Sequence, residues 1–335
     1  MWKDALALTA AAYMSLWVST AVAQGRGETV RIQDYPATGN MLFRVAIAKG
    51  YCEKYGIRCH LQMIPTAPLA TQALLSKNLD VALLPVEVQV NAMVRGAAIK
   101  AFAGGVAENV FLISVRNDVA TANSDKGFPA FMADLKGRKI GVTSRGAAPE
   151  LLMTFLALKA EMKADDFTFV AVGAPITAYA SLVSKQIDAM MTFEPAGAMC
   201  DLLKTCKTIY RIADATAPAE LAATNGGAGN LVAAQDFIDK NPHVIDALTK
   251  AAVDAEAFLQ NRANFDEAVK IMLQSFTLDT PRGDEIMTHA LKRTISGYRV
   301  AIGRPAVKAI TDYMFATQQL EVPFDAMRIV LPSAP

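Results

Sequence analysis

The chain has little net charge, few histidines and few long apolar runs. Among its 335 residues, 33 Lys and Arg nearly balance 32 Asp and Glu, so the net charge is only +1. That balance argues against a nucleic-acid-binding protein, which carries a basic face or stripe. The three His are scattered and no CxxC or HxxxH spacing occurs, so we predict no metal site and no cofactor.

One segment has the composition of a membrane-directed leader. Residues 5–25 carry no charge, Lys3 precedes them, and Ala21-Val-Ala23 resembles the cleavage site of a secretory signal peptide. We therefore predict a cleaved signal peptide over residues 1–23 and a periplasmic protein, with an uncleaved anchor as the alternative. The first cysteine is Cys52, so no lipid anchor on an N-terminal cysteine is expected.

The four cysteines form two local pairs. In an exported chain an even number of cysteines indicates disulfides. We predict the bridges Cys52–Cys59 and Cys200–Cys206, with free buried thiols as the alternative. Each bridge closes a short loop, so each should stabilise the fold by no more than ~2–3 kcal/mol.

A weak internal repeat relates two stretches that lie 108 positions apart. Residues 74–81 (LLSKNLDV) match residues 182–189 (LVSKQIDA), and residues 31–32 match residues 139–140 at the same offset. In both copies predicted strands alternate with predicted helices, which indicates βαβ units and parallel sheets. The predicted class is therefore α/β, with two similar lobes.

The two predicted lobes are not consecutive in the chain. A strand predicted at residues 110–115 leads out of the first lobe, and one at residues 230–234 leads back. The helical pattern from Asp236 onward packs most simply on the first lobe. Two lobes joined by two crossing strands can open and close, with the hinge near residues 113–116 and 224–230.

Six short stretches, in a fixed order along the chain, carry a family resemblance. They are residues 48–57 (AKGYCEKYGI), 75–82 (LSKNLDVA), 134–142 (DLKGRKIGV), 182–189 (LVSKQIDA), 193–195 (FEP) and 232–242 (VAAQDFIDKNP). In these stretches the sequence resembles periplasmic solute-binding proteins of ABC importers, in the group that binds nitrate, taurine, alkanesulfonates and thiamine pyrimidines.

The resemblance implies a type-2 periplasmic-binding fold. The first lobe would comprise residues 28–112 and 228–330, and the second residues 116–222. It also implies a small-molecule ligand, with an ABC permease and its ATPase subunit as partners. We expect a monomer that binds no nucleic acid.

Ligands of open α/β sheets bind outside the carboxyl ends of the strands. This rule predicts a site built from six loops, namely residues 34–40, 65–68, 85–87, 143–147, 173–175 and 192–195. The loop 143–147 joins a strand to a helix, whose free N–H groups and dipole favour an anion. We predict that Ser144, Arg145 and Gly146 contact an anionic group there, with plain helix capping as the alternative.

Further candidate residues follow other strands. Thr38, Gly39 and Asn40 occupy the place in the first lobe that Ser144 occupies in the second. Glu87 and Glu194 follow the third strand of each lobe, where a carboxylate can accept from an ammonium, an amide or a pyrimidine amine. Tyr35 and Phe193 are candidates to flank a flat ligand, and Asn225 to supply an amide contact.

These features predict a binding protein that captures a small anionic or zwitterionic organic solute of sulfonate or taurine type. A pyrimidine, an aromatic carboxylate and nitrate are the alternative ligands. An enzyme is disfavoured, because residues 141–146 do not form GxSxG and the chain has no Walker sequence or GxGxxG. The clustered cysteine motif of the related fungal pyrimidine-synthesis enzymes is also missing. A ligand-presenting sensor module is a further alternative.

Overall fold

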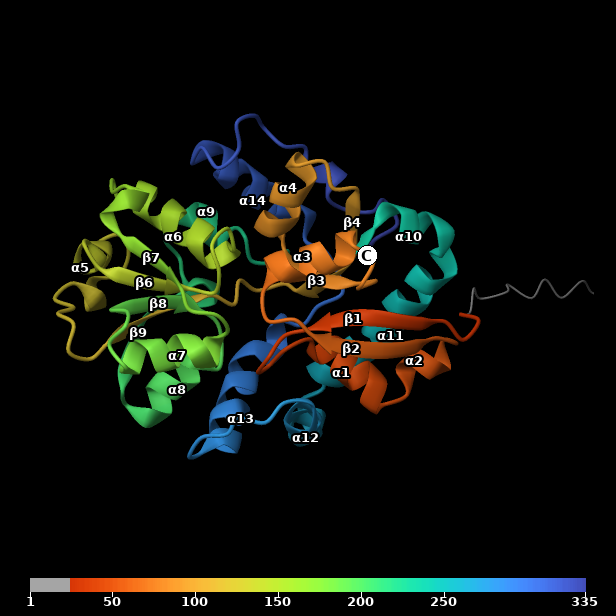
Figure 1. Cartoon of the computed structure of the whole chain (residues 1–335). Helices are drawn as coiled ribbons and strands as arrows, with labels where there is room; N and C mark the ends of the chain where they lie inside the picture. The colour runs from red at the N-terminus through yellow and green to blue at the C-terminus, as the bar shows by residue number, and fades with distance from the viewer. Residues whose placement is uncertain (1–24) are drawn as a thin grey trace, which may run out of the picture.

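Strands and helices alternate along the chain, as the internal repeat predicts, and the α/β class is confirmed (Figure 1). The structure is a computed structural model that describes residues 25–335. The predicted signal peptide, and with it any N-terminal anchor, lies outside the described residues. Within residues 25–335 no helix has both the length and the apolar character that crossing a membrane requires.

One group of strands, called sheet I here, combines segments that are distant in sequence. Its strands are β1 (Thr29–Asp34), β2 (Arg58–Met63), β3 (Ala82–Pro85), β4 (Ile99–Val106) and β10 (Gly229–Ala234). β1 and β2 pair in parallel, whereas β10 lies between β3 and β4 and is antiparallel to both. A bridge between Ile32 and Val81 joins these two parts.

The second group, sheet II, is a single five-stranded sheet in the order β7-β6-β8-β5-β9. Its strands are β5 (Leu112–Arg116), β6 (Lys139–Val142), β7 (Thr168–Ala171), β8 (Ala189–Thr192) and β9 (Cys206–Arg211). β6 pairs in parallel with both β7 and β8, while β5 runs antiparallel between β8 and β9. The two sheets lie side by side, sheet II on the left of Figure 1.

Helices cover both sheets. Those preceding β5 or following β10 are α1 (Met41–Ala48), α2 (Tyr51–Lys54), α3 (Ala67–Leu75), α4 (Val86–Val94), α10 (Gln235–Lys240), α11 (Pro242–Gln260), α12 (Phe265–Ser275), α13 (Gly283–Thr294) and α14 (Arg304–Ala316). Those between β5 and β10 are α5 (Met132–Leu135), α6 (Ala148–Lys159), α7 (Pro175–Val183), α8 (Ala196–Leu203) and α9 (Ala219–Ala222).

The repeat is visible as the same hydrogen bond in both sheets. The Asp80 carboxylate accepts from the backbone N–H of Arg31 at 2.8 Å, and the Asp188 carboxylate accepts from that of Lys139 at 3.0 Å. In each copy the aspartate precedes the third strand and ties it to the first. This pairing explains why Asp80 and Asp188 recur at the same offset.

Both predicted disulfides are confirmed. Cys52 in α2 is bonded to Cys59 in β2, and Cys200 in α8 is bonded to Cys206 in β9, with Cα atoms 5.9 and 4.7 Å apart. Each bridge joins a helix to the strand that follows it. The disulfides therefore fasten local elements and do not link sheet I to sheet II.

The chain passes between the sheets through two neighbouring segments. The carbonyl of Ala107 accepts from the N–H of Gly226 at 2.7 Å, so the outgoing and returning segments are hydrogen-bonded to each other. The predicted hinge range 113–116 lies within β5, which is paired on both edges, and the crossing precedes it at residues 107–111. The lobe boundaries and the hinge motion stay predictions.

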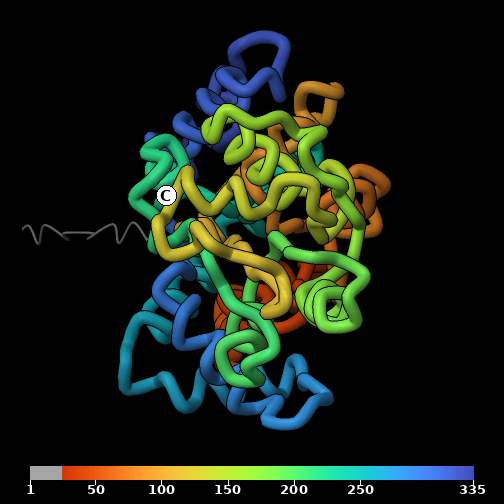
Figure 2. Tube along the Cα trace, turned by 90° about the vertical axis from the view of Figure 1, so that its left-hand side faces the viewer, coloured from red at the N-terminus to blue at the C-terminus, as the bar shows by residue number. Residues whose placement is uncertain are grey.

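The C-terminal helices pack around sheet I, as predicted, and also reach the other side. α1 contacts α11 and α12, which places these helices beside β1 and β2. α13 in addition contacts α8, and α14 contacts both α4 and α9. Figure 1 shows α13 below and α14 above the gap between the two sheets, and in Figure 2 blue C-terminal parts of the chain lie at the bottom and at the top. Both helices therefore contact a helix that follows a strand of sheet II in the chain.

Candidate ligand-binding site

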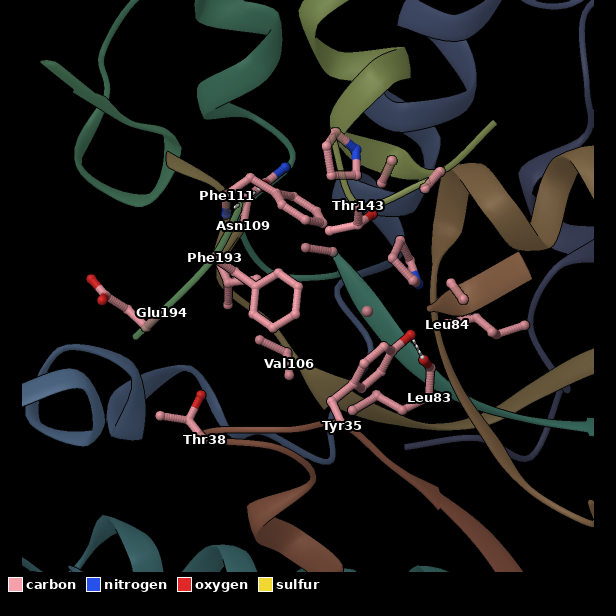
Figure 3. A pocket seen from close by; sticks show the side chains of 18 of the residues that line it. Tyr35, Thr38, Leu83, Leu84, Val106, Asn109, Phe111, Thr143, Phe193 and Glu194 are labelled. Atoms are coloured by element: carbon pink, nitrogen blue, oxygen red, sulfur yellow. Dashed lines mark hydrogen bonds between the residues drawn. The ribbon is translucent and has the colours of Figure 1, made fainter. Parts of the chain in front are cut away.

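A cavity opens where the carboxyl ends of the strands of sheets I and II meet (Figure 3). Its space amounts to about 910 Å³ when the opening to solvent is counted. Five of the six predicted loops contribute to its wall, and the loop 173–175 does not. The strand-end rule therefore found nearly half of the wall residues from sequence.

Six of the predicted site residues line this cavity. They are Tyr35, Thr38, Gly39, Glu87, Phe193 and Glu194. Asn40, Ser144, Arg145, Gly146 and Asn225 are not part of its lining. The structure thus gathers the aromatic and acidic candidates with Thr38 and Gly39, and it leaves Ser144, Arg145 and Gly146 out of the lining. A ligand contact at any of these positions stays a prediction.

A buried ion pair shapes the loop that carries Thr38 and Gly39. The Arg44 guanidinium donates to the Asp34 carboxylate at 2.8 Å, and the two side chains are 0% and 4% exposed. The same guanidinium donates to the carbonyls of Tyr35 and Ala37 at 2.8 and 2.6 Å. The loop after β1 is therefore folded around one charged side chain.

Gly39 and Asn40 complete this loop. Gly39 has φ +50°, and a Cβ at this position would lie 2.2 Å from Arg44 Nη2, so only glycine fits here. Asn40 is buried and caps α1, because its side chain accepts from the N–H of Phe43 at 3.4 Å. Asn40 therefore lies outside the cavity lining, and its role as the N-cap of α1 explains its position.

An acidic side chain occupies the position at which we predicted an anionic ligand. Glu150, in the first turn of α6, accepts from Arg145 Nε at 2.9 Å and from the N–H of Gly146 at 2.7 Å. The Arg145 side chain is 66% exposed and borders a different hollow, beside α3 and α4. The Arg145 side chain and the N–H of Gly146 are thus paired with the chain's own carboxylate. A Glu in the first helical turn was the sequence signal for this arrangement.

The remaining two candidates, Ser144 and Asn225, also lie outside the cavity lining. The Ser144 hydroxyl is buried and has no hydrogen-bond partner among the described residues. Asn225 accepts from the N–H of Asn109 at 2.8 Å, within the crossing segments. Asn225 therefore helps to hold the two crossings together.

Three aromatic rings form the centre of the cavity wall. Phe193 meets both Tyr35 and Phe111 edge to face, with ring centroids 6.1 Å apart in each pair. Tyr35 donates its hydroxyl to the carbonyl of Leu83 at 2.9 Å, and burial raises the pKa of this phenol. Figure 3 shows Phe193 between the other two rings. Tyr35 follows a strand of sheet I and Phe193 one of sheet II, so the Tyr35–Phe193 contact spans the two sheets.

The charged groups of the wall are all acidic. Glu87, Glu108 and Glu194 line the cavity, and no Lys or Arg is found among its described lining residues. The Glu194 carboxylate points away from the rings and is paired with Arg211. Glu87 is 2% exposed, and its described hydrogen-bond partner is the Tyr313 hydroxyl. The described wall therefore offers no positively charged side chain to an anionic ligand.

Burial governs the ionisation of Glu87. Loss of hydration raises its pKa above the ordinary 4.5, and the hydrogen bond from Tyr313 offsets part of this rise. A buried acid with a raised pKa stabilises the fold below its unfolded pKa, and this stabilisation is lost as the pH rises through the folded pKa. The change is ~1.4 kcal/mol for each pH unit between the two pKa values.

We therefore predict that Glu87→Gln removes the contribution of this carboxyl group to the pH dependence of the free energy of unfolding. The free energy of unfolding of the wild type, measured in urea from pH 4 to pH 8, should fall relative to that of Glu87→Gln as the pH rises. The exposed Glu321 provides the control, because Glu321→Gln should run parallel to the wild type. Parallel curves for Glu87→Gln as well would contradict the assigned cause.

Several residues that line the cavity were not predicted from the sequence. Thr294 and Tyr298, at the end of α13 and after it, line the cavity, and the Tyr298 hydroxyl donates to the carbonyls of Thr38 and Gly39 at 3.0 and 2.9 Å. No local pattern marks Tyr298, which lies about 260 positions from its two hydrogen-bond partners. Thr66, in contrast, lies in a predicted loop, and its buried hydroxyl has no partner among the described residues.

The chain is similar to known binding proteins. A family model described as NMT1/THI5 like matches residues 38–263. A protein of Brucella abortus, named as a binding protein, is 28% identical over 250 residues, which cover 74% of this chain and 70% of that protein.

Two solved structures show the same fold. The ligand-binding component of an ABC-type import system from Staphylococcus aureus aligns with a TM-score of 0.71 at 19% identity, covering 91% of this chain and 97% of that one. The alkanesulfonate-binding protein SsuA of Xanthomonas axonopodis aligns with a TM-score of 0.69 at 16% identity, covering 90% and 98%. Since the family model covers more than half of the sequence, the chain belongs to the NMT1/THI5-like family, and its resemblance to periplasmic solute-binding proteins is confirmed.

Proposed function

We propose that the chain is the solute-binding component of an ABC importer, which captures a small molecule between sheets I and II and delivers it to a membrane permease and its ATPase. The cavity at the strand ends supports this role, as does the likeness to the ligand-binding component from Staphylococcus aureus. Two disulfides fit an oxidising compartment such as the periplasm. The role requires binding and release of the ligand, without turnover.

The lining of the cavity carries the proposal on ligand class. We propose a flat, mostly apolar ligand that bears an N–H donor or a positive charge, with aminopyrimidines as the representative chemistry. Tyr35, Phe111 and Phe193 offer ring contacts on an apolar ligand body, and Glu87 offers a buried acceptor. The sulfonate type predicted from sequence has less support, because Glu150 already binds Arg145 and Gly146.

A thermal-shift screen tests both parts of the proposal. The compounds are 4-aminopyrimidine, benzoate, taurine, an alkanesulfonate and nitrate. A bound ligand raises the unfolding free energy by RT ln(1 + [L]/Kd), which is ~2.7 kcal/mol at a hundredfold excess over Kd. We expect 4-aminopyrimidine to raise Tm and the sulfonates and nitrate to leave it unchanged.

Two results would contradict the proposal. Stabilisation by the sulfonates alone would contradict the ligand class, and conversion of a bound compound, detected by mass spectrometry, would contradict the binding role. Arg145→Ala is the matched variant, because this exposed side chain borders a different hollow. The shift with 4-aminopyrimidine should be the same in Arg145→Ala and in the wild type.

A further inference from the structure

Asp201 is the centre of a charged cluster that joins α8 to α13. Its carboxylate lies 3.2 Å from Arg211 Nη2, 3.5 Å from Arg293 Nη2 and 3.6 Å from His289 Nε2. Arg211 belongs to β9 of sheet II, whereas His289 and Arg293 belong to α13. Arg293 also donates to His289 Nε2 at 3.2 Å, which orders the α13 side of the cluster. One carboxylate therefore contacts an arginine on each side, Arg211 of β9 and Arg293 of α13.

The same cluster extends to the cavity wall through Arg211. Its Nη1 atom is paired with the Glu194 carboxylate, which also accepts from the N–H of Ala198 at 2.8 Å. Gly197 leaves the space for this pair, since a Cβ there would lie 2.7 Å from both Arg211 Nη2 and Glu194 Oε1. Glu194, Arg211 and Asp201 thus form one continuous chain of charged contacts.

α13 is suited to transmit a movement between the sheets. It contacts α12, which packs against α1 beside sheet I, and its last residue, Thr294, lines the cavity. A second contact to α8 lies near its start, where Arg282 donates to the carbonyl of Leu202 at 2.8 Å. The side chains of Asp201 and Arg293 are about one-third exposed or more, so their contact is screened by water and can be broken easily.

We infer that Asp201 forms an ionic latch between α8 and α13, which favours the closed arrangement of the two sheets and positions Glu194 in the cavity wall. This inference rests on the proposed function, in which the sheets close around a ligand. In Asp201→Asn the closed arrangement loses its contacts to Arg293 and Arg211. The apparent ligand affinity should then fall in proportion to the closed fraction.

Spin-label distances test the latch without any ligand. All four native cysteines are disulfide-bonded, so Lys204→Cys and Asp284→Cys provide selective labelling sites on the two sides of the α8–α13 contact. Asp201→Asn and Arg293→Gln should each add a population with a longer distance, and Asp201→Glu should retain the short one. Asp246→Asn is the control, because Asp246 is paired with Lys250 within α11.

Distances that match the wild type in both Asp201→Asn and Arg293→Gln would overturn the latch, and Arg293→Gln alone suffices if Asp201→Asn does not fold. The binding arm uses 4-aminopyrimidine, whose Kd should rise about three- to tenfold in Asp201→Asn. If this compound does not bind the wild type, the proposed ligand class fails, while the distances still test the latch.

Discussion

Replacing Arg44 with methionine is expected to lower the free energy of unfolding by about 3–5 kcal/mol. The substitution leaves the Asp34 carboxylate buried without its partner, and the side chain of Asp34 is only 4% exposed. It also removes the donors to the carbonyls of Tyr35 and Ala37. Equilibrium unfolding in urea measures the loss.

Two further variants separate the charge effect from the loss of packing. The double variant Arg44→Met with Asp34→Leu removes both charges and should recover part of the stability, because no unpaired charge remains buried. Arg95→Met replaces an exposed arginine after α4 and should change the unfolding free energy by less than ~0.5 kcal/mol. A loss below about 1 kcal/mol in Arg44→Met would show that the pair does not hold the loop.

Replacing Phe193 with alanine is expected to weaken ligand binding about a hundredfold, which corresponds to ~2.7 kcal/mol. Phe193 lies between Tyr35 and Phe111 and spans the gap between the two sheets. Its truncation removes ring contacts with the ligand and, in the same step, an aromatic contact between the sheets. Isothermal titration with the compound that gives the largest thermal shift measures the effect.

Two control variants show whether a loss of affinity comes from the position of Phe193 in the cavity wall or from the loss of any apolar side chain. Phe315→Ala changes a phenylalanine of α14 that is 42% exposed, and it should leave the affinity unchanged. Phe193→Leu keeps apolar bulk without the ring and should give an intermediate affinity. An affinity within threefold of the wild type in Phe193→Ala would remove this residue from the site.

Local features of the sequence predicted a large part of the fold. The alternation of strands and helices is set by short sequence patterns, and the repeat shows the same patterns twice. Each disulfide joins a helix to the strand that follows it. Tyr35, Glu87 and Phe193 were found because each follows a strand, and strand ends meet at one edge of a sheet. Such rules work where local geometry decides the position of a residue.

The structure adds what the sequence does not show where two groups compete or where distant segments meet. The N–H groups at the start of α6 suit an anion, but Glu150 is close in sequence and its carboxylate already accepts from one of them, the N–H of Gly146. The predicted hinge range 113–116 overlaps β5, because a strand leading out of the lobe looks the same as a connection until its partners β8 and β9 are known. Tyr298 depends on packing across the whole chain, which no short pattern reports.

The ion pair of Asp34 and Arg44 has a consequence for redesign of the cavity. One wall of the cavity is built on a loop whose backbone is fixed by Arg44 and by the lack of a side chain at Gly39, so most substitutions there would disturb folding. The opposite wall carries Thr143 and Phe193, which directly follow β6 and β8 and are not themselves members of an ion pair among the described residues. Libraries that diversify Thr143 and Phe193 should therefore yield folded receptors with new ligands far more often than libraries that diversify residues 34–40.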